Sequence, residues 1–301
     1  MIPLKRVLGD KRAIFLFCFP ALLLFAVFVL YPMGHIVVMS MQSYAGIGEA
    51  TFIGFRNFQR LMDDSVFLTA NLNSIGLAFL TVLVDTIFAL IFALLIVGLR
   101  PLLQKLYRIL FLIPFVLSIA VISQLWLAVY QPEFGLLNTA LDMLGLGFLR
   151  HGWLLDPRVA LVCVAFVGMW WVFGMQLLLF YTGYRSIPES LFEAARIDGA
   201  NHFQSSTRIA LPLLSNILRL SLIMTTVGGL YTFPQVYIMT GGGPGDTTMT
   251  VMMYMYKQVF SNTRYGLGSA ISLVAILQTT VLIVLISIGI RIWTKNENIV
   301  Y

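Results

Sequence analysis

The 301-residue chain contains few charged residues and very few cysteines and histidines. Asp, Glu, Lys and Arg make up only 11% of it and hydrophobic residues 59%, which excludes an ordinary soluble globular domain. The two cysteines, Cys18 and Cys163, both lie in apolar runs, which argues against a disulfide framework or a thiolate metal site. The three histidines are scattered without ligand spacing, so we expect no metal site.

The chain also lacks the nucleotide-binding sequence G-x-x-x-x-G-K-[ST], and Gly-Lys occurs nowhere in it. The glycine-rich stretch 241–245 has no lysine after it, so we interpret it as a turn or a protein contact and not as a phosphate site. We therefore expect this chain to bind no cofactor and to catalyse no reaction.

What the sequence does contain is a series of long apolar runs. A membrane span needs about 20 apolar residues, and six runs of that length predict an all-α membrane protein with six transmembrane helices in one domain, residues 1–301. The first run is too long for the apolar core of a signal peptide and lacks a small-residue cleavage site, so we expect it to be retained. The six predicted spans are residues 14–39, 71–98, 107–130, 159–181, 217–239 and 267–293.

The distribution of basic residues predicts the orientation. Thirteen Lys and Arg residues lie at the termini and in the second and fourth connections, against six in the other loops. The positive-inside rule then places both termini and the segment between spans four and five in the cytoplasm. The net charge of +6 favours contact with anionic membrane lipids rather than nucleic acid.

A polar segment between spans four and five, about residues 185–216, carries the strongest local signals. Ser186 with Glu189 three residues later predicts a helix start, and Gly199 predicts its end in the left-handed conformation. The helix between them is expected to present one apolar face, formed by Leu191, Ala194, Ala195 and Ile197. Asn201 with Gln204 predicts a second start, so the segment is expected to form a helix, a turn and a second helix. Its three acidic and three basic residues over 185–208 balance, which argues against DNA binding. These residues alone leave open an interfacial amphipathic loop without a partner.

The segment contains Glu193-Ala194-Ala195, then Asp198-Gly199-Ala200, then Ile209-Ala210-Leu211-Pro212. These motifs and their spacing resemble the EAA loop of binding-protein-dependent ABC transporter permeases. The resemblance implies that the first helix is a coupling helix that docks in a cleft of an ATP-hydrolysing subunit. The six residues that it implies in coupling are Glu193, Ala194, Ala195, Asp198, Gly199 and Ala200. Ser206 and Asn216 depart from the family pattern, where a large apolar residue and a second proline are usual.

Three further motifs resemble the carbohydrate-uptake branch of the same family. They are residues 52–58 after the first span, 132–138 after the third and 240–244 after the fifth, the last typical of the first permease of a heterodimeric pair. The resemblance implies a bacterial or archaeal plasma-membrane (inner-membrane) importer of a sugar-like substrate. It also implies a second homologous permease, two ATPase subunits that use ATP and Mg²⁺, and an extracytoplasmic solute-binding protein.

The resemblance further implies a substrate path along spans four and five. The positions that match the sugar-lining residues of maltose-transporting members are Gly168, Trp171, Val172, Met175, Gly229, Tyr231 and Thr232. Several amides of those members are replaced here by glycine or threonine, so we expect a substrate other than maltose. Small-residue helix packing is an alternative explanation of the glycines, and Pro234 predicts a kink in span five.

Asp85 lies in the middle of span two, where an unpaired ionisable group costs at least about 2.5 kcal/mol. It is either part of a pore or partner contact, or a protonated or hydrogen-bonded structural residue. It also supports a rival hypothesis, an ion-coupled secondary transporter with Asp85 as the coupling group. That class usually shows internal repeats and several intramembrane acids, which this sequence lacks.

Overall fold

The computed structural model describes residues 11–296, with the side chains of residues 15–294 except residue 202. The described chain is mostly helical and groups into two compact units. The first unit comprises the chain up to Asp63 together with Met255–Val274, and the second comprises Asp64–Tyr254 together with the chain from Ala275 onward. The basic residues 5 and 6 and the two ends of the chain, whose cytoplasmic position was predicted, lie outside the described residues.

The first unit contains the first predicted span and a small hairpin. Its elements are α2 (Lys11–Phe25), the π-helical turn η1 (Ala26–Leu30), α3 (Tyr31–Ser40), β1 (Gln42–Ser43), β2 (Thr51–Phe52), α4 (Arg56–Asp63), η5 (Lys257–Ser261) and the beginning of α17 (Tyr265–Asn296). The two strands pair antiparallel, with Gln42 opposite Phe52. Asn57, from the motif at residues 52–58, is buried and donates to the carbonyl oxygens of Ser40 and Gln42, both at 2.9 Å. This asparagine therefore fixes α4 against the end of α3.

The second unit contains the other predicted spans. Its elements are α5 (Ser65–Thr81), η2 (Val82–Thr86), α6 (Ile87–Val97), α7 (Pro101–Val116), α8 (Ile119–Val129), α9 (Leu136–Met143), η3 (Gly147–Leu149), α10 (Ala160–Arg185), α11 (Glu189–Ile197), α12 (His202–Ser205), η4 (Ser206–Ala210), α13 (Leu211–Leu213), α14 (Ser215–Leu230), α15 (Pro234–Met239), most of α16 (Val251–Tyr256) and the remainder of α17.

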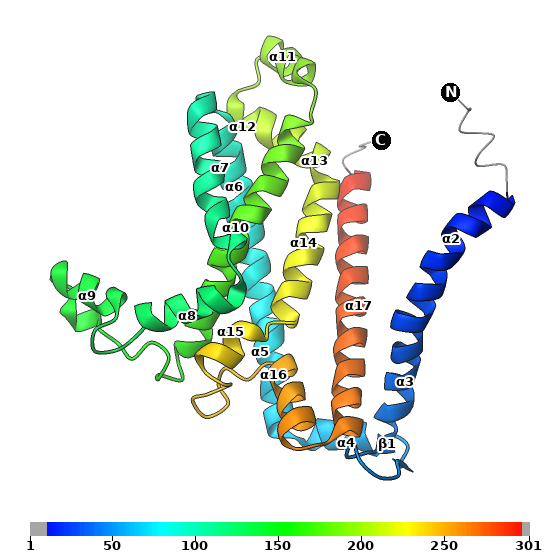
Figure 1. Cartoon of the computed structure of the whole chain (residues 1–301). Coiled ribbons are helices and arrows are strands. Elements are labelled where there is room, and N and C mark those ends of the chain that lie inside the picture. Colours follow the sequence, from blue (N-terminus) through cyan, green and yellow to red (C-terminus); the bar gives the residue numbers. More distant parts are fainter. Residues whose placement is uncertain (1–10, 297–301) are drawn as a thin grey trace. The chain divides into compact units, whose positions relative to one another are not determined.

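Helix α10 is the centre of the second unit (Figure 1). It packs along α6 and α7 and also touches α14, while α14 packs along α5. At Gly174 the two backbones of α10 and α7 come so close that an added Cβ would lie 1.9 Å from the carbonyl oxygen of Phe111. A buried cluster then joins α6 to α10, with Ala93 on one helix and Leu177 and Phe180 on the other. Small residues thus bring these helices into contact, as expected for helices that pack in a membrane.

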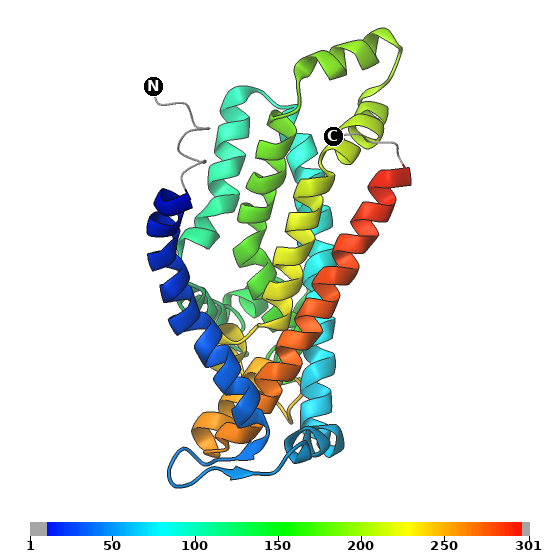
Figure 2. The ribbon, with the colours of Figure 1, turned by 90° about the vertical axis from the view of Figure 1, so that its right-hand side faces the viewer.

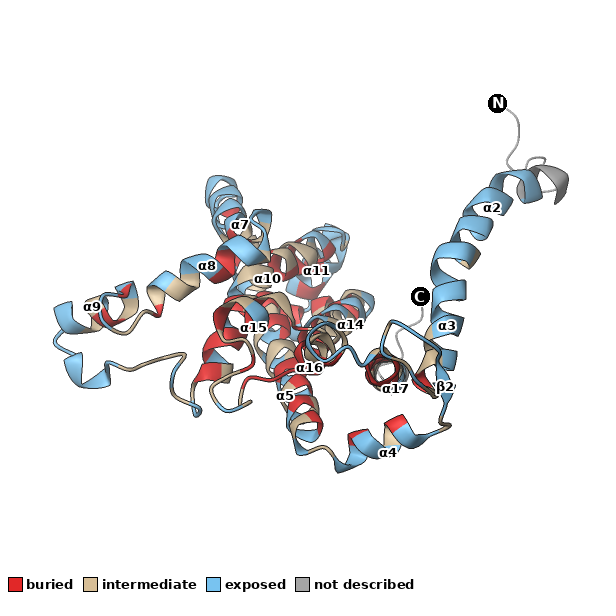
Figure 3. Cartoon of the chain, turned by 60° about the horizontal axis from the view of Figure 1, so that its bottom comes forward, coloured by how far each residue is buried: buried red, intermediate tan, exposed pale blue. Residues whose placement is uncertain are grey.

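The burial pattern separates this centre from its surroundings. In Figure 3, α10, α14 and α15 carry many buried residues, whereas α7 is largely exposed and α8 and α9 carry few buried residues. The exposed positions of α7 include Leu102, Leu106 and Ile113, all apolar. Exposed apolar residues on a helix of this composition are suited to lipid or to another membrane subunit.

The third predicted span is broken, which corrects the expectation of one continuous helix over 107–130. Helices α7 and α8 meet at an angle of 96°. Leu117 and Ser118 between them have extended backbones, with ψ of 150° and 145°. Pro114 lies one turn before the break, and Ser118 caps α8 by accepting from the N–H of Val121 at 3.4 Å. A proline and a capping serine this close explain the break.

The fifth predicted span is interrupted, as the proline predicted. Helix α14 ends at Leu230 and α15 begins at Pro234, whose missing N–H suits a first helical position. Five helices of the described chain are long and apolar enough to cross a membrane, and the bent pair α7 and α8 makes a sixth. The prediction of an all-α membrane protein with six spans is therefore confirmed, with the third span broken.

Candidate functional site: the connecting segment and the interior of the second unit

The segment between α10 and α14, residues 186–214, is called the connecting segment here. It lies beyond one end of α10 and α14, at the opposite end of the second unit from α15 (Figure 2). It forms α11, a turn, and then the consecutive short elements α12, η4 and α13. The predicted helix, turn and second helix are therefore present in the structure.

Gly199 ends α11 in the conformation that the sequence predicted. Its φ is +82°, and its N–H donates to the carbonyl oxygen of Arg196 at 3.1 Å. The N–H of Ala200 reaches back to the carbonyl oxygen of Ala195 at 2.8 Å. These two bonds form a Schellman motif, which satisfies the last carbonyls of α11 and requires a left-handed residue at this position. An L-residue with a side chain is strained there, so the glycine fixes where α11 stops.

The second helix begins with a reciprocal cap. The N–H of Gln204 donates to Oδ1 of Asn201 at 2.8 Å, and the N–H of Asn201 donates to Oε1 of Gln204 at 2.9 Å. This is the capping box that the spacing of the two residues predicted. Because the capping box and the Schellman turn lie within ten residues, 195–204, this part of the connecting segment is determined locally.

The start of α11 differs from the prediction. Ser186 was expected to cap α11, but it ends α10 and its hydroxyl donates to the carbonyl oxygen of Gly183 at 2.7 Å. Helix α11 begins at Glu189 after Pro188, without a side-chain cap. Serine hydroxyls bond preceding carbonyls and following N–H groups with similar ease, and the Ile187-Pro188 pair favours an extended backbone between the two helices.

The two faces of α11 have different surroundings. Phe192 and Ala195 are buried, and the Phe192 ring stacks on Tyr184 of α10 with centroids 5.2 Å apart. Leu191 and Ile197 are exposed, Ile197 at 86%, and Ala194 is exposed on the same side. The expectation that Ala195 shares one apolar face with Leu191, Ala194 and Ile197 is therefore wrong, because Ala195 faces the protein. The remaining apolar stripe is open to a partner.

Glu193 and Asp198, the acidic residues implied in coupling, are both exposed. Among the described residues, neither carboxylate forms a side-chain hydrogen bond or an ion pair. Two exposed carboxylates therefore lie on α11 and at its end, on the helix that also carries the exposed apolar stripe.

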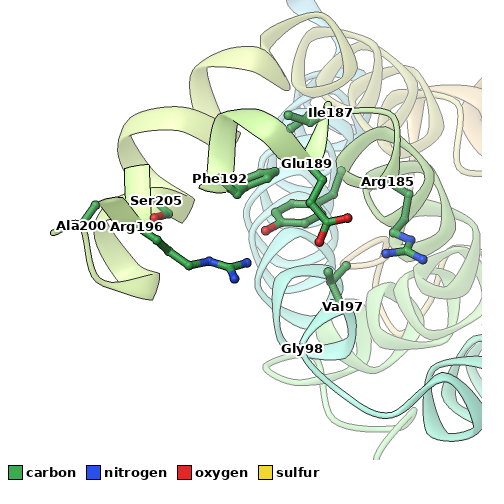
Figure 4. Close-up of a pocket in the computed structure, with 10 residues that line it drawn as sticks. Val97, Gly98, Arg185, Ile187, Glu189, Phe192, Arg196, Ala200 and Ser205 are labelled. Carbon is green, nitrogen blue, oxygen red and sulfur yellow. The ribbon is translucent and has the colours of Figure 1, made fainter. Parts of the chain in front are cut away.

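A cavity of about 680 Å³ lies beneath α11, between it and the ends of α6 and α10. Figure 4 shows Glu189, Arg185 and Arg196 around it, with Phe192 on the α11 wall and Val97 on the α6 wall. The charged side chains at its rim contrast with the apolar outer stripe of α11.

The residues implied in a substrate path lie on α10, at the end of α14 and in the gap before α15. A Cβ on Gly168 would lie 2.9 Å from the side-chain amide nitrogen of Gln235. A Cβ on Gly229 would lie 2.4 Å from the Cα atom of Ala78 in α5, so Gly229 is a point of close helix contact. Trp171 donates its indole N–H to the carbonyl oxygen of Leu117 at 2.9 Å, at the break between α7 and α8.

The other four positions are spread over two elements. Val172 and Met175 of α10 are half-buried, and Tyr231 lies in the gap between α14 and α15. Thr232 is buried, and two hydrogen bonds fix its position in that gap. Its hydroxyl donates to the Gly228 carbonyl at 3.0 Å, and its own carbonyl accepts from the hydroxyl of Thr250 at 2.8 Å. The structure thus places Gly168 of α10 against Gln235 of α15, Gly229 against α5, and Thr232 against Gly228 and Thr250.

Asp85 lies in η2, the π-helical turn in the middle of the second span. The wider turn directs two consecutive residues, Asp85 and Thr86, into the protein, with Asp85 only 1% exposed. Oδ1 of Asp85 has no hydrogen-bond partner in the described chain. The carboxyl lines a cavity of about 420 Å³ whose other walls are mostly aromatic, including Phe111, Trp170 and Phe173.

Sequence reasoning missed a line of buried polar side chains on the other side of η2. The hydroxyls of Thr86 and Ser221 are 3.3 Å apart, and Ser221 donates to Oε1 of Gln176 at 2.9 Å. The Thr81 hydroxyl is 3.2 Å from the Thr225 carbonyl oxygen, and it also bonds to carbonyls one turn back in its own helix. This polar line links η2, α10 and α14. The Ser and Thr at positions 221 and 225 of an apolar helix, one turn apart, were the available signal.

Comparison with known proteins identifies the family. Residues 85–296 match the model of the binding-protein-dependent transport system inner membrane component, and the chain belongs to this family. It is 34% identical to a probable ABC transporter permease, YurN, of Bacillus subtilis, over 91% of this chain and 94% of that protein. It is 31% identical to the trehalose/maltose transport system permease MalF of Thermococcus litoralis, over 91% and 92% of the two chains.

The fold is also similar to a solved structure, that of a bacterial alginate ABC transporter in complex with an alginate pentasaccharide-bound periplasmic protein. The TM-score is 0.83 at 21% sequence identity, with 98% of this chain and 99% of that chain covered. At this identity the likeness establishes the fold. The chain is thus an inner-membrane component of an ABC transporter, as the EAA-like motifs predicted.

Proposed function

We propose that the chain is the membrane-spanning permease subunit of an ABC importer for a sugar, an oligosaccharide or a related polyol derivative. Family membership supports the permease role. The substrate class is supported by relatives whose names specify trehalose or maltose and sn-glycerol 3-phosphate. The first-permease motif at residues 240–244 supports a heterodimer with a second, homologous permease.

The connecting segment is the observation that carries this proposal. A helix with a fixed end at Gly199, an exposed apolar stripe and two unpaired carboxylates is suited to fit a cleft in another protein. Because Phe192 and Tyr184 stack, force on α11 is transmitted to α10 without an intervening flexible loop. In the proposed mechanism, α11 docks on an ATPase subunit, and Glu193 and Asp198 meet groups of that partner.

Transport then proceeds by alternating access. Two partner ATPase subunits bind ATP and Mg²⁺ and close on each other, α11 follows them, and α10 and α14 move with it to open the path outward. A solute-binding protein on the outer side delivers the substrate. This chain contributes the substrate path and no catalytic residue. Its helix α11 acts as a lever, which means that it passes the movement of the ATPase subunits on to α10 and α14. In this orientation the connecting segment and both termini are cytoplasmic, in agreement with the distribution of Lys and Arg.

For the substrate path, the α15 side of α10 is the best supported location. Gly168 leaves space that the Gln235 amide reaches, and the interruption of the fifth span provides backbone that is not fully paired within a helix. The Trp171 and Tyr231 rings offer faces on which a sugar ring can stack. The tight contact of Gly229 with Ala78 supports a role of that glycine in helix packing instead.

The test is ATP hydrolysis in proteoliposomes that contain this chain together with its neighbouring permease, ATPase and binding protein. Valine at position 199 forces a β-branched side chain to a φ of +82°, at a cost of about 1–2 kcal/mol, and displaces the end of α11. We expect Gly199→Val to abolish ATP turnover stimulated by the sugar-loaded binding protein, while the complex still purifies.

Gly145→Val is the matched control. Gly145 has a φ of +73° in the loop after α9, and, as at Gly199, an added Cβ would meet no atom within 4 Å. The same strain is thus introduced away from the connecting segment, and we expect stimulated turnover to remain. Normal stimulated turnover in Gly199→Val would contradict the lever role.

The rival hypothesis is an ion-coupled transporter that uses Asp85. Membership in a binding-protein-dependent family favours the importer. The unpaired, buried carboxyl of Asp85 still requires a test, and uptake driven by a proton gradient through this chain alone would favour the rival.

A further inference from the structure

A groove of about 380 Å³ runs between the beginning of α14 and the last turns of α17, both in the second unit. It is separate from the connecting segment's cavity and from the proposed substrate path. Its polar lining residues are Ser215, Asn216, Arg219, Ser287, Arg291 and Thr294.

The two helices contribute matching pairs to this groove. Ser215 and Arg219 are four residues apart on α14, and Ser287 and Arg291 are four residues apart on α17. Residues at this spacing lie on one face of a helix. Each helix therefore presents a hydroxyl and a guanidinium together, and the groove brings the two faces to the same space.

The electrostatics of the groove favour an anion. Among the described residues, no carboxylate lines the groove and neither Arg219 nor Arg291 forms an ion pair. Two guanidinium groups offer up to ten N–H donors in planar forks, the geometry that suits phosphate oxygens. Serine, threonine and asparagine side chains beside them supply further neutral donors.

The apolar part of the groove indicates what carries the anion. Ile283, Val284 and Ile288 line its α17 side, and the last two are about half exposed. They lie one to two turns from Arg291 toward the middle of a membrane-spanning helix. A ligand that fills the whole groove therefore has an anionic head at the helix ends and a hydrocarbon body along α17, which describes a phospholipid and not a free phosphate.

We propose that this groove binds the phosphate of an anionic phospholipid, with Arg219 and Arg291 as its principal ligands and the acyl chain along α17. Because α14 follows the connecting segment directly, a bound lipid would join the first turn of α14 to α17. The site does not depend on which substrate the transporter carries.

The test uses the full chain purified in a neutral detergent and native mass spectrometry to count bound lipid. We expect phosphatidylglycerol to bind with one molecule per chain and phosphatidylcholine to bind far more weakly. With about a factor of five from each arginine, Arg219→Gln/Arg291→Gln should weaken phosphatidylglycerol binding about 25-fold. Arg150→Gln/Arg158→Gln, which removes two arginines from the loop before α10, should leave it unchanged.

Three results would overturn the proposal: equal binding of the two lipids, unchanged binding in Arg219→Gln/Arg291→Gln, or an equal loss in the Arg150→Gln/Arg158→Gln control. sn-Glycerol 1-phosphate is the remaining probe, and binding as tight as that of phosphatidylglycerol would assign the groove to a free phosphate and reject the lipid. If the double variant does not fold, the two single variants replace it, and each is expected to lose about five-fold in affinity.

Discussion

The connecting segment and the polar line inside the second unit are both held by hydrogen bonds outside the regular helical pattern, but at very different sequence separations. The caps of the connecting segment join residues three to five apart, such as Asn201 and Gln204. The polar line joins Thr86 to Ser221, 135 residues away, and Ser221 to Gln176, 45 residues away. The first region can therefore keep its shape as its surroundings change, whereas the second exists only when three helices are packed together.

This difference fits the proposed lever. A segment that must move against another protein needs an internally fixed shape, and local caps provide it. A bundle that must pass between two arrangements needs contacts between helices that can be exchanged, and hydroxyls that bond weakly across an interface provide those.

The largest effect should come from the helix contact at the centre of the bundle. Alanine at Gly174 places a Cβ 1.9 Å from the Phe111 carbonyl oxygen, so α7 and α10 must separate, at a cost of about 3 kcal/mol or more. We expect Gly174→Ala to lower strongly both the membrane-inserted yield and the thermal unfolding temperature.

Gly289→Ala in α17 is the control for this change. An added Cβ at Gly289 meets nothing within 4 Å, and alanine is the better helix former by about 1 kcal/mol. Its unfolding temperature should be equal to or higher than that of the wild type. Equal behaviour of the two variants would show that the close approach at Gly174 does not determine stability.

The polar line should be the next most sensitive. Ser221→Ala removes the donor to Gln176 and leaves that buried amide oxygen without its partner, which costs about 1–2 kcal/mol. Thermal unfolding measures the loss. Thr280→Ala is the comparison, because the Thr280 hydroxyl is exposed and bonds only within its own helix, and it should change stability by less than about 0.5 kcal/mol.

These two regions also explain how much of the structure could be predicted from the sequence. The spans, the Gly199 turn and the Asn201 cap depend on patterns within about twenty residues, and all of them were predicted. The polar line depends on which helices become neighbours, and nothing near Ser221 in the sequence identifies Gln176 as its partner. The wrong assignments, Ser186 as a cap and Ala195 on the outer face, arose where a local pattern allowed two arrangements and packing selected one.

The cap of the second helix should have a smaller and more local effect. Asn201→Ala removes the acceptor for the Gln204 N–H and costs about 1 kcal/mol. We expect faster hydrogen exchange of the amides at 203–206, with the global unfolding temperature unchanged. Asn201→Asp keeps the acceptor and should restore protection, whereas a global loss of stability would show that the connecting segment is not locally determined.

The smallest effect is expected at Asp85, which belongs neither to the connecting segment nor to the hydrogen bonds of the polar line. Although it adjoins Thr86 of the polar line, its carboxyl faces the aromatic cavity, and Oδ1 has no partner in the described chain. An amide at this position keeps the shape and removes a group that costs at least about 2.5 kcal/mol to insert when charged. We therefore expect Asp85→Asn to express at least as well as the wild type and to retain ATP-driven uptake within about two-fold.

Asp85→Leu separates the two explanations of this residue. If the carboxyl is only a tolerated buried group, leucine, which is larger but branches at the same carbon and is apolar like the wall of the adjoining cavity, should also retain uptake. If both variants insert normally but lose uptake, the carboxyl takes part in transport, and the η2 turn that directs it inward becomes part of the mechanism. Loss in the leucine variant alone would indicate that a hydrogen bond at this position, and not its charge, is needed.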